Sequence, residues 1–183
     1  MFPRKKRPLK RRRKKIKLAF SPGPVYNDSG KGAHMVSVLD VARYILEQTG
    51  PTTTMKLQKL VYYCQAWSLA WDDEPLFDEE FQAWANGPVC PELFDKHRGE
   101  FRISESKLAG YNAKLTDAQR ETVRKVLAYY GDKEPHWLGE LTHLEGPWRD
   151  ARLGVPMGEP SSNVIEKDSM QQYYGGLSRG EIR

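Results

Sequence analysis

One stretch of seventeen residues, MKLQKLVYYCQAWSLAW at 55–71, constrains the fold of this chain most strongly. Threonines at 52–54 can cap a helix that starts here, and the Asp-Asp-Glu-Pro sequence at 72–75 ends it. The apolar stripe of this helix is wide enough for a buried central helix; it contains Leu57, Leu60, Val61, Cys64, Trp67, Ser68 and Trp71. The sequence therefore predicts a helix at the centre of a core. The polar residues free for other roles would be Lys56, Gln58, Lys59 and Gln65.

Helical spacing and turn residues predict further elements on both sides. Apolar residues recur from Val38 to Leu46, and Gly50-Pro51 ends this first helix. Residues 76–84 read as a short strand or hairpin arm, followed by the Asn-Gly-Pro turn at 86–88. Later helices are predicted to start at Pro91, at the capping box of residues 116–119, near Trp137 and at Asp168. The last three are expected to end at Gly131, Leu144 and Tyr174, and residues 99–115 form a looser connection.

The basic charge of the chain is confined to its first part. Between positions 4 and 17, eleven of fourteen residues are Lys or Arg. Residues 1–34 hold twelve basic residues and one acidic residue, whereas the rest holds seventeen basic and twenty-three acidic residues. The net charge of +5 therefore conceals a balance of −6 after residue 34. Because an acidic surface repels phosphate backbones and favours basic partners, we expect nucleic-acid binding only through the first segment.

This charge division, together with the Pro/Gly/Ser-rich segment that follows the basic run, predicts three parts. They are a disordered basic arm at 1–34, a domain at 36–176 and a flexible tail at 177–183. The sequence GKGAHM at 30–35 allows the arm to lie outside the natural protein. Its codons can include a ribosome-binding sequence just before Met35, and Gly-Ala-His-Met resembles the remnant of a cloning site. Both interpretations make Met35 the natural start, and the alternative is an arm that tethers the protein to nucleic acid.

No combination of residues predicts catalysis, a cofactor or a metal site. The chain lacks a phosphate-binding loop, a Gly-x-Ser-x-Gly motif and a His-Glu-x-x-His motif. His136 and His143 stand seven residues apart, a weak pattern for a metal. Cys64 lies on the apolar stripe and Cys90 in a more open loop, as expected for reduced cytoplasmic thiols. No apolar stretch is long enough to cross a bilayer, so we expect a cytoplasmic, non-enzymatic protein that does not enter membranes.

Residues 72–80 hold six acidic residues in nine positions. A calcium-binding loop would need a central glycine, and Phe77 stands there instead. We therefore expect a solvated acidic hairpin that faces a basic partner. Its interface candidates are Asp72, Asp73, Glu74, Asp78, Glu79 and Glu80, with Phe77 and Trp84 as apolar anchors. The five tryptophans should mostly be core, with one or two at the edge of an interface.

Three motifs, in this order, resemble one known family. MKLQKLVYYCQAW, PLFDEEFQAWANGPVCPELF and ELTHLEGPWRDAR are similar to the Panacea domain, the SocA-like or GepA-like antitoxin domain of bacteria and their phages. The resemblance covers about residues 38–175. Asn86 stands where the family usually has an aromatic residue, Cys90 replaces a small residue or valine, and Ser68 stands where His is common. These departures bear on partner specificity and not on membership.

The resemblance implies a mainly α, compact single domain with a small β-hairpin element. It implies a non-enzymatic antitoxin of a type II-like toxin–antitoxin system, which binds a toxin that is usually encoded by the adjacent gene. The alternative within the family is an adaptor that delivers its toxin to the ClpXP protease. The motif residues with expected structural roles are Leu57, Leu60, Tyr63, Trp67, Gly87, Pro88, Trp148 and Arg152. Trp148 with Arg149 or Arg152 is predicted to form a stacked or ion-paired clasp with the acids of residues 72–80.

Two other functions stay open. One is a nucleic-acid-binding regulator that acts through residues 1–34, and the more remote one is an enzyme that uses Cys90 or His143.

Overall fold

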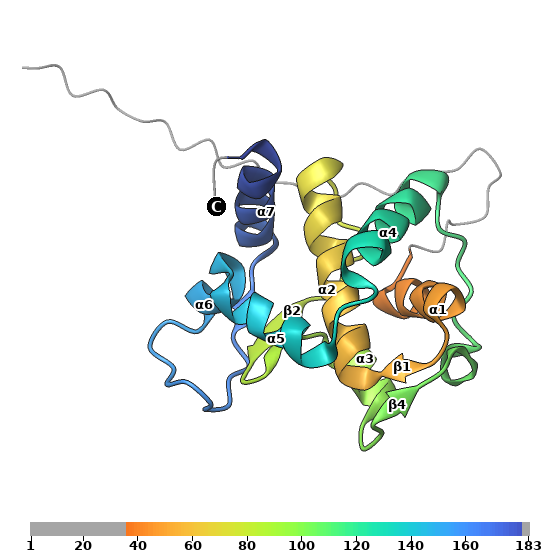
Figure 1. The fold of residues 1–183 in the computed structure, drawn as a ribbon, viewed down its shortest axis with the longest axis horizontal. Coiled ribbons are helices and arrows are strands. Elements are labelled where there is room, and N and C mark those ends of the chain that lie inside the picture. The colour runs from red at the N-terminus through yellow and green to blue at the C-terminus, as the bar shows by residue number, and fades with distance from the viewer. Residues whose placement is uncertain (1–35, 181–183) are drawn as a thin grey trace, which may run out of the picture. The chain divides into compact units, whose positions relative to one another are not determined.

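A computed structural model describes residues 36–180, so the predicted basic arm lies outside the described residues. In this part the chain is mainly helical with two small antiparallel sheets (Figure 1), which confirms the predicted fold class. The α-helices are α1 (Val38–Thr49), α2 (Thr54–Trp71), α3 (Pro91–His97), α4 (Asp117–Tyr130), α5 (Pro135–Leu144), α6 (Gly146–Ala151) and α7 (Lys167–Arg179). Capping boxes at Ser37 and Thr116 fix the starts of α1 and α4, the second as the sequence predicts.

The strands form two sheets, of which the sequence predicts one hairpin. β2 (Phe81–Trp84) pairs antiparallel with β3 (Gly87–Val89) through a turn at residues 85–86, and on its other edge with β5 (Val164–Ile165). The turn therefore lies earlier than the predicted one at 86–88, and Gly87 and Pro88 belong to β3. The second sheet joins β1 (Thr52–Thr53) to β4 (Arg102–Ile103). β1, β4 and β5 have two residues each, which is too short for the alternation that marks a strand in sequence.

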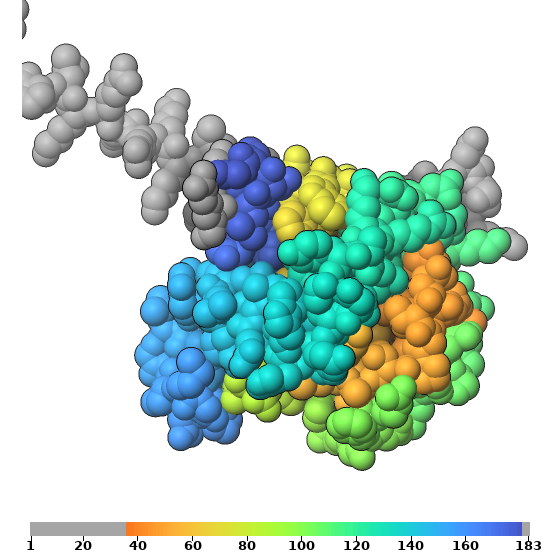
Figure 2. Space-filling model, viewed as in Figure 1, coloured from red at the N-terminus to blue at the C-terminus, as the bar shows by residue number. Residues whose placement is uncertain are grey.

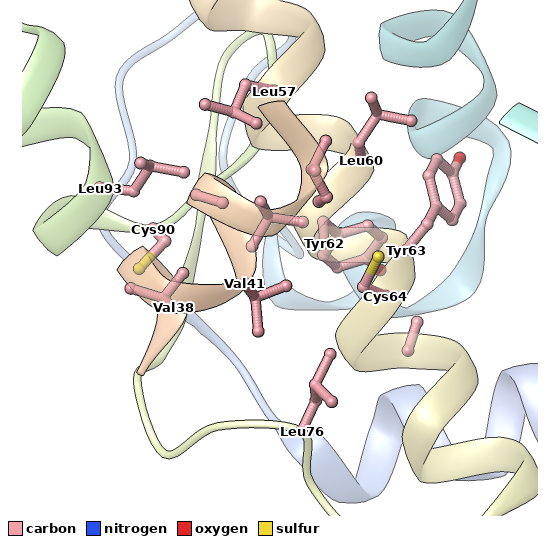
Figure 3. Packing of buried hydrophobic residues seen from close by; sticks show 14 of the residues in the cluster. Val38, Val41, Leu57, Leu60, Tyr62, Tyr63, Cys64, Leu76, Cys90 and Leu93 are labelled. Carbon is pink, nitrogen blue, oxygen red and sulfur yellow. The ribbon is translucent and has the colours of Figure 1, made fainter. Parts of the chain in front are cut away.

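Helix α2 lies at the centre of the domain and contacts α1, α4, α5 and α7 (Figure 1). Its side chains Leu57, Leu60, Tyr62 and Tyr63 are fully buried, and Figure 3 shows them in the core together with Val38 and Val41 of α1 and Leu93 of α3. The predicted central helix is therefore confirmed. Trp71, which the sequence places on the same stripe, is 40% exposed because it lies in the last turn, beyond the core.

Three of the four polar residues of α2 that the sequence predicts to be free are buried, whereas Lys56 is partly exposed. Gln58, Lys59 and Gln65 are at most 2% exposed. Gln58 exchanges two hydrogen bonds with the backbone of Cys90, and Lys59 Nζ donates to the carbonyl oxygen of Pro88 at 3.0 Å. Since buried backbone groups need partners, the helix supplies them from its side chains.

Gln65 is the clearest example of an α2 side chain that pairs with buried backbone groups of another segment. Its Nε2 donates to the carbonyl oxygen of Phe77 at 2.8 Å, and its Oε1 accepts from the backbone N–H of Leu76 at 2.8 Å. Gln65→Ala should therefore lower the free energy of unfolding by about 3 kcal/mol, because it leaves buried backbone groups unpaired. Urea denaturation followed by circular dichroism measures this. The control Gln171→Ala removes one exposed hydrogen bond, and an equal loss in both variants would contradict the prediction.

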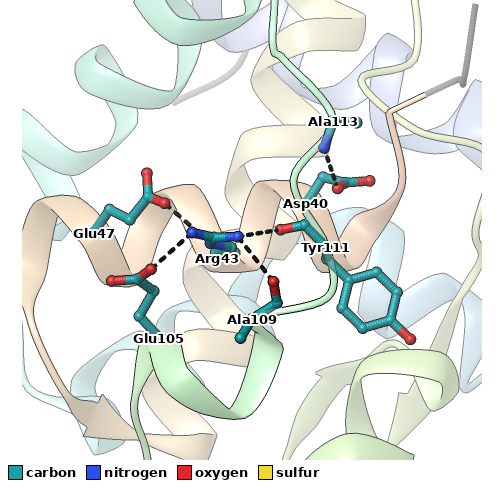
Figure 4. A network of polar contacts seen from close by, with 7 residues as sticks. All are labelled: Asp40, Arg43, Glu47, Glu105, Ala109, Tyr111 and Ala113. Atoms are coloured by element: carbon teal, nitrogen blue, oxygen red, sulfur yellow. Dashed lines mark hydrogen bonds and ion pairs between the residues drawn. The ribbon is translucent and has the colours of Figure 1, made fainter.

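The predicted loose connection at 99–115 contains a 3₁₀ helix, η1 (Glu105–Leu108), and is fastened to α1 by polar contacts (Figure 4). Arg43 Nη1 donates to the carbonyl oxygen of Tyr111 at 3.0 Å. Asp40 Oδ1 accepts from the backbone N–H of Ala113 at 2.8 Å. Two charged residues of α1 thus fix a segment that has little regular structure.

The C-terminal helix begins earlier and ends later than the sequence predicts. Glu166 occupies the cap position, and Asp168 lies within the first turn. The helix continues to Arg179, five residues past Tyr174, so residues 177–179 of the predicted tail are helical. The Gly-Gly pair at 175–176 favours an end there, but both glycines are buried in the packing of α7 on α2, which outweighs their low helix propensity.

Candidate functional site

The acidic loop, residues 72–80, divides into acids with internal partners and acids without them. Asp72 accepts a hydrogen bond from Thr122 Oγ1 at 3.0 Å, and Glu79 accepts from the backbone N–H of Val38 at 3.1 Å. Asp73 accepts from Gln171 Nε2 at 3.0 Å. No hydrogen bond or ion pair joins the exposed carboxylates of Glu74, Asp78 and Glu80 to another residue between 36 and 180.

The two predicted anchors differ in exposure. Phe77 is 2% exposed and packs against Phe81 with ring centroids 6.1 Å apart, so the prediction that it anchors a partner is wrong. The backbone carbonyl of Phe77 accepts a hydrogen bond from the buried Gln65, and acidic neighbours in the sequence give no sign of this burial. Trp84 is partly exposed, and its ring meets Phe94 edge-on at 4.8 Å.

Trp84 lines a groove of about 890 Å³ between the start of α2, the β2–β3 hairpin and residues 155–163. Lys59 reaches this groove although it is 1% exposed, and burial lowers its pKa to about 7. Burial also lowers the pKa of His97, which lies 3.1 Å from Gln58. The walls are mainly apolar. This Trp84 groove is therefore a mainly apolar hollow that contains one amine with a lowered pKa.

A second groove, of about 630 Å³, lies between α2, α4, α5 and α7. Figure 2 shows the ends of α2 (yellow), α4 (teal) and α7 (dark blue) beside one another above α5. We call it the aromatic groove after the residues that characterise it, which are Trp67, Trp71, Tyr129, Tyr130, Trp137 and Glu145. Trp71, Tyr129 and Trp137 are 40%, 63% and 41% exposed, so three large aromatic side chains face solvent around one hollow.

Glu145 forms the polar part of the aromatic groove. It is 5% exposed, and its Oε2 accepts hydrogen bonds from Tyr63 at 3.1 Å and Tyr174 at 2.7 Å. Burial raises the pKa of this carboxyl to about 7, and the two tyrosine hydroxyls offset only part of that rise. Tyr130 stacks on Tyr63 with ring centroids 4.1 Å apart, and its hydroxyl accepts from Trp67 Nε1 at 3.2 Å.

The predicted clasp exists in part, but it does not reach the acidic loop. The Arg152 guanidinium lies over the Trp148 ring at 5.1 Å, as a stacked clasp requires. Its hydrogen bonds run to backbone carbonyls, among them Ala83 at 2.8 Å and Glu159 at 2.7 Å. The predicted ion pair with residues 72–80 is therefore wrong, because the guanidinium donates to these backbone carbonyls instead.

The predicted interface residues and the residues that line the aromatic groove are largely different sets. Asp72 follows Trp71 directly, so the acidic loop starts at the rim of the aromatic groove. Tyr129, Trp137 and Glu145 were not among the predicted interface residues. Glu145 lies inside the motif ELTHLEGPWRDAR, but a glutamate gives no signal of its own burial in sequence. Its hydrogen bonds come from tyrosines far away along the chain.

The described residues carry no group of three or more His, Cys, Asp and Glu that could hold a metal ion. Cys90, predicted to be the more open thiol, is fully buried. The ring of His143 stacks on Trp148 at 4.1 Å. Within residues 36–180, no helix has both the length and the apolar character needed to span a membrane.

Comparison with protein families gives one match at this point. The family model described as "Antitoxin SocA-like, Panacea domain" matches residues 57–149. This region runs from α2 to α6 and therefore includes the β2–β3 hairpin and three of the four helices around the aromatic groove. Comparisons with curated proteins and with solved structures found no match.

Proposed function

The chain belongs to the SocA-like Panacea antitoxin family, and on this basis we propose that it neutralises a cognate toxin by direct protein–protein binding. One observation indicates which surface would bind the toxin. Trp71, Tyr129 and Trp137 are exposed around the same groove. Exposed aromatic patches of this kind characterise protein interfaces, where Trp and Tyr supply most of the binding energy.

The acidic loop supports the same surface through its charge. It starts at Asp72, immediately after Trp71 on the groove rim. Its exposed carboxylates at Glu74, Asp78 and Glu80 have no partner among residues 36–180 and attract a basic protein surface. Such charges mainly accelerate association, while the aromatic residues hold the complex. The toxin would be neutralised by occlusion of its active or substrate-binding surface.

Co-expression with the product of the neighbouring gene tests this function. We expect the wild-type protein to restore growth and to co-purify with the toxin. The double variant Trp71→Ala/Trp137→Ala should lose both effects, because each truncation of an interface tryptophan costs about 2 kcal/mol or more of binding. Phe101→Ala is the matched control, since Phe101 is 78% exposed but does not line the groove. Absence of rescue and of a complex with the wild-type protein would overturn the proposal.

The same assay separates direct binding from two alternatives. In a host without ClpXP, rescue by direct binding persists, whereas rescue by a protease adaptor is lost. A chain that starts at Met35 should retain rescue if the domain is responsible. Loss of rescue on removal of residues 1–34 would instead favour a nucleic-acid-binding regulator that acts through the basic arm.

A further inference from the structure

The aromatic groove contains a carboxylate that lacks a counter-charge. Glu145 is 5% exposed, and only its Oε2 accepts hydrogen bonds, both of them from tyrosine hydroxyls. Among residues 36–180, no ion pair and no other hydrogen bond reaches its side chain. Since a buried carboxylate is costly without a cationic partner, this position gains most from a cation that enters the groove.

The walls of the groove fit the same kind of group. Indole and phenol faces attract cations through their ring electrons, and Trp is the most favourable of them. The groove already shows this preference at its rim, where Lys125 Nζ lies 5.6 Å from the Trp71 ring centroid. Lys125 pairs no closer than 3.8 Å with Glu121 and does not reach Glu145. The outer part of the groove therefore holds a cation of the domain itself, and the inner part does not.

We propose that the aromatic groove is a binding site for an arginine or lysine side chain of the partner protein, with Glu145 as its counter-charge. Trp71, Tyr129 and Trp137 enclose the aliphatic part of that side chain and the cation. The volume of about 630 Å³ is large enough for one long side chain and its flanking backbone. The site takes its partner, the toxin, from the proposed function, but binding of the basic group itself does not depend on it.

Charge decides against the other occupants. A nucleic acid would bring phosphates close to the acidic loop, which begins directly after the groove residue Trp71, and this is unfavourable. A second copy of this domain would bring the same acidic loop and a domain balance of −6 after residue 34. A basic side chain from a different protein is attracted both by the acidic loop and by the carboxylate of Glu145 in the groove.

A small probe tests the site without the toxin. The full-length protein is titrated with N-acetyl-L-arginine amide, and the tryptophan indole N–H signals are followed by nuclear magnetic resonance, assigned with Trp71→Phe and Trp137→Phe. We expect the signals of both residues to shift with a dissociation constant in the millimolar range, on the order of a few kcal/mol of binding. The citrulline analogue has the same shape without charge, and it should bind at least about tenfold more weakly.

Two variants locate the effect in the groove. Glu145→Gln keeps the shape and can still accept from both tyrosines, yet it should weaken arginine binding by about tenfold or more. Glu140→Gln, an exposed position on α5 outside the groove, should leave binding unchanged. If Glu145→Gln does not fold, Trp137→Ala decides in its place, because this side chain is 41% exposed and lies outside the core.

Several results would overturn the proposal. Equal binding of the arginine and citrulline probes would remove the role of charge, and unchanged binding in Glu145→Gln or Trp137→Ala would place the probe elsewhere. Sedimentation that shows a dimer in the wild type and a monomer in Trp137→Ala would assign the groove to a second copy. Arginine binding without rescue from a toxin would sink the proposed function alone, and rescue without arginine binding would sink this inference alone.

Discussion

Gly87→Ala should lower the free energy of unfolding by about 3 to 4 kcal/mol, a large effect for a single methyl group. Gly87 opens β3 with a φ of +100°, a conformation that residues with a side chain rarely adopt. An added Cβ would also lie 2.7 Å from Lys59 Cε and 2.8 Å from Thr142 Oγ1. The lysine cannot move aside without breaking its hydrogen bond to Pro88 in the core.

Gly99→Ala is the matched control for this substitution. Gly99 has a φ of +81°, but an added Cβ would meet no atom within 4 Å. This variant should therefore lose only the cost of backbone strain, about 1 kcal/mol. Urea denaturation of both variants gives the difference, which measures the close contact at the hairpin. Similar losses of unfolding free energy in the two variants would show that Lys59 and Thr142 move away from the added methyl group at little cost.

The second large effect concerns pH, and it also depends on Lys59. Burial lowers the pKa of this amine from its ordinary 10.5 to about 7, so the unfolded chain holds more protons than the folded one between these values. The free energy of unfolding should therefore rise with pH in this window, by up to about 1.4 kcal/mol per pH unit. The loss of stability that the buried ammonium group causes is fully present below pH 7, and it disappears as the pH approaches 10.5.

A window of pH 7.5 to 8.5 isolates this effect from the other shifted groups. Glu145, whose pKa is raised to about 7, favours the folded state at low pH and loses that contribution as the pH rises through 7. Burial raises the pKa of Cys64 and Cys90 above their ordinary 9.0, so the thiols lower stability only toward pH 9 and above. His97, with a lowered pKa, has released its proton in both states.

Lys59→Met tests the assignment. We expect the rise between pH 7.5 and 8.5, measured as urea midpoints at several pH values, to disappear in this variant. Lys56→Met removes the same charge from a partly buried position on the same helix and should keep the rise. A wild-type protein whose stability does not change across this window would show that the amine keeps its proton in the core.

The predictable part of this fold is the part that local patterns specify. The apolar stripe of α2, the capping box at Thr116 and the turn before Pro88 are each contained in a few neighbouring residues, and the structure has all three. The burial of Gln58, Lys59 and Gln65 has no such signature. These side chains are buried because the backbone of later segments needs hydrogen-bond partners, and sequence patterns treat polar residues as exposed.

The candidate site was less predictable for a related reason. The acidic loop is contiguous in sequence and could be recognised, whereas the aromatic groove takes its walls from four helices. Tyr129 and Trp137 each look like ordinary helix residues until the packing of α4 and α5 places them around Glu145. The three motifs were sufficient to predict the family, and the match at residues 57–149 supports that prediction. They did not indicate the aromatic groove.

The position of α7 has a consequence for the order of events during synthesis. Tyr174 on this helix donates to Glu145, contacts Tyr62 and closes the core over α2. Before residues 167–179 leave the ribosome, Glu145 lacks this donor and the groove lacks the wall that contains Leu177. A nascent chain that already holds every residue of the matched region therefore still has no complete groove. The site proposed for a basic side chain is complete only once translation has delivered α7.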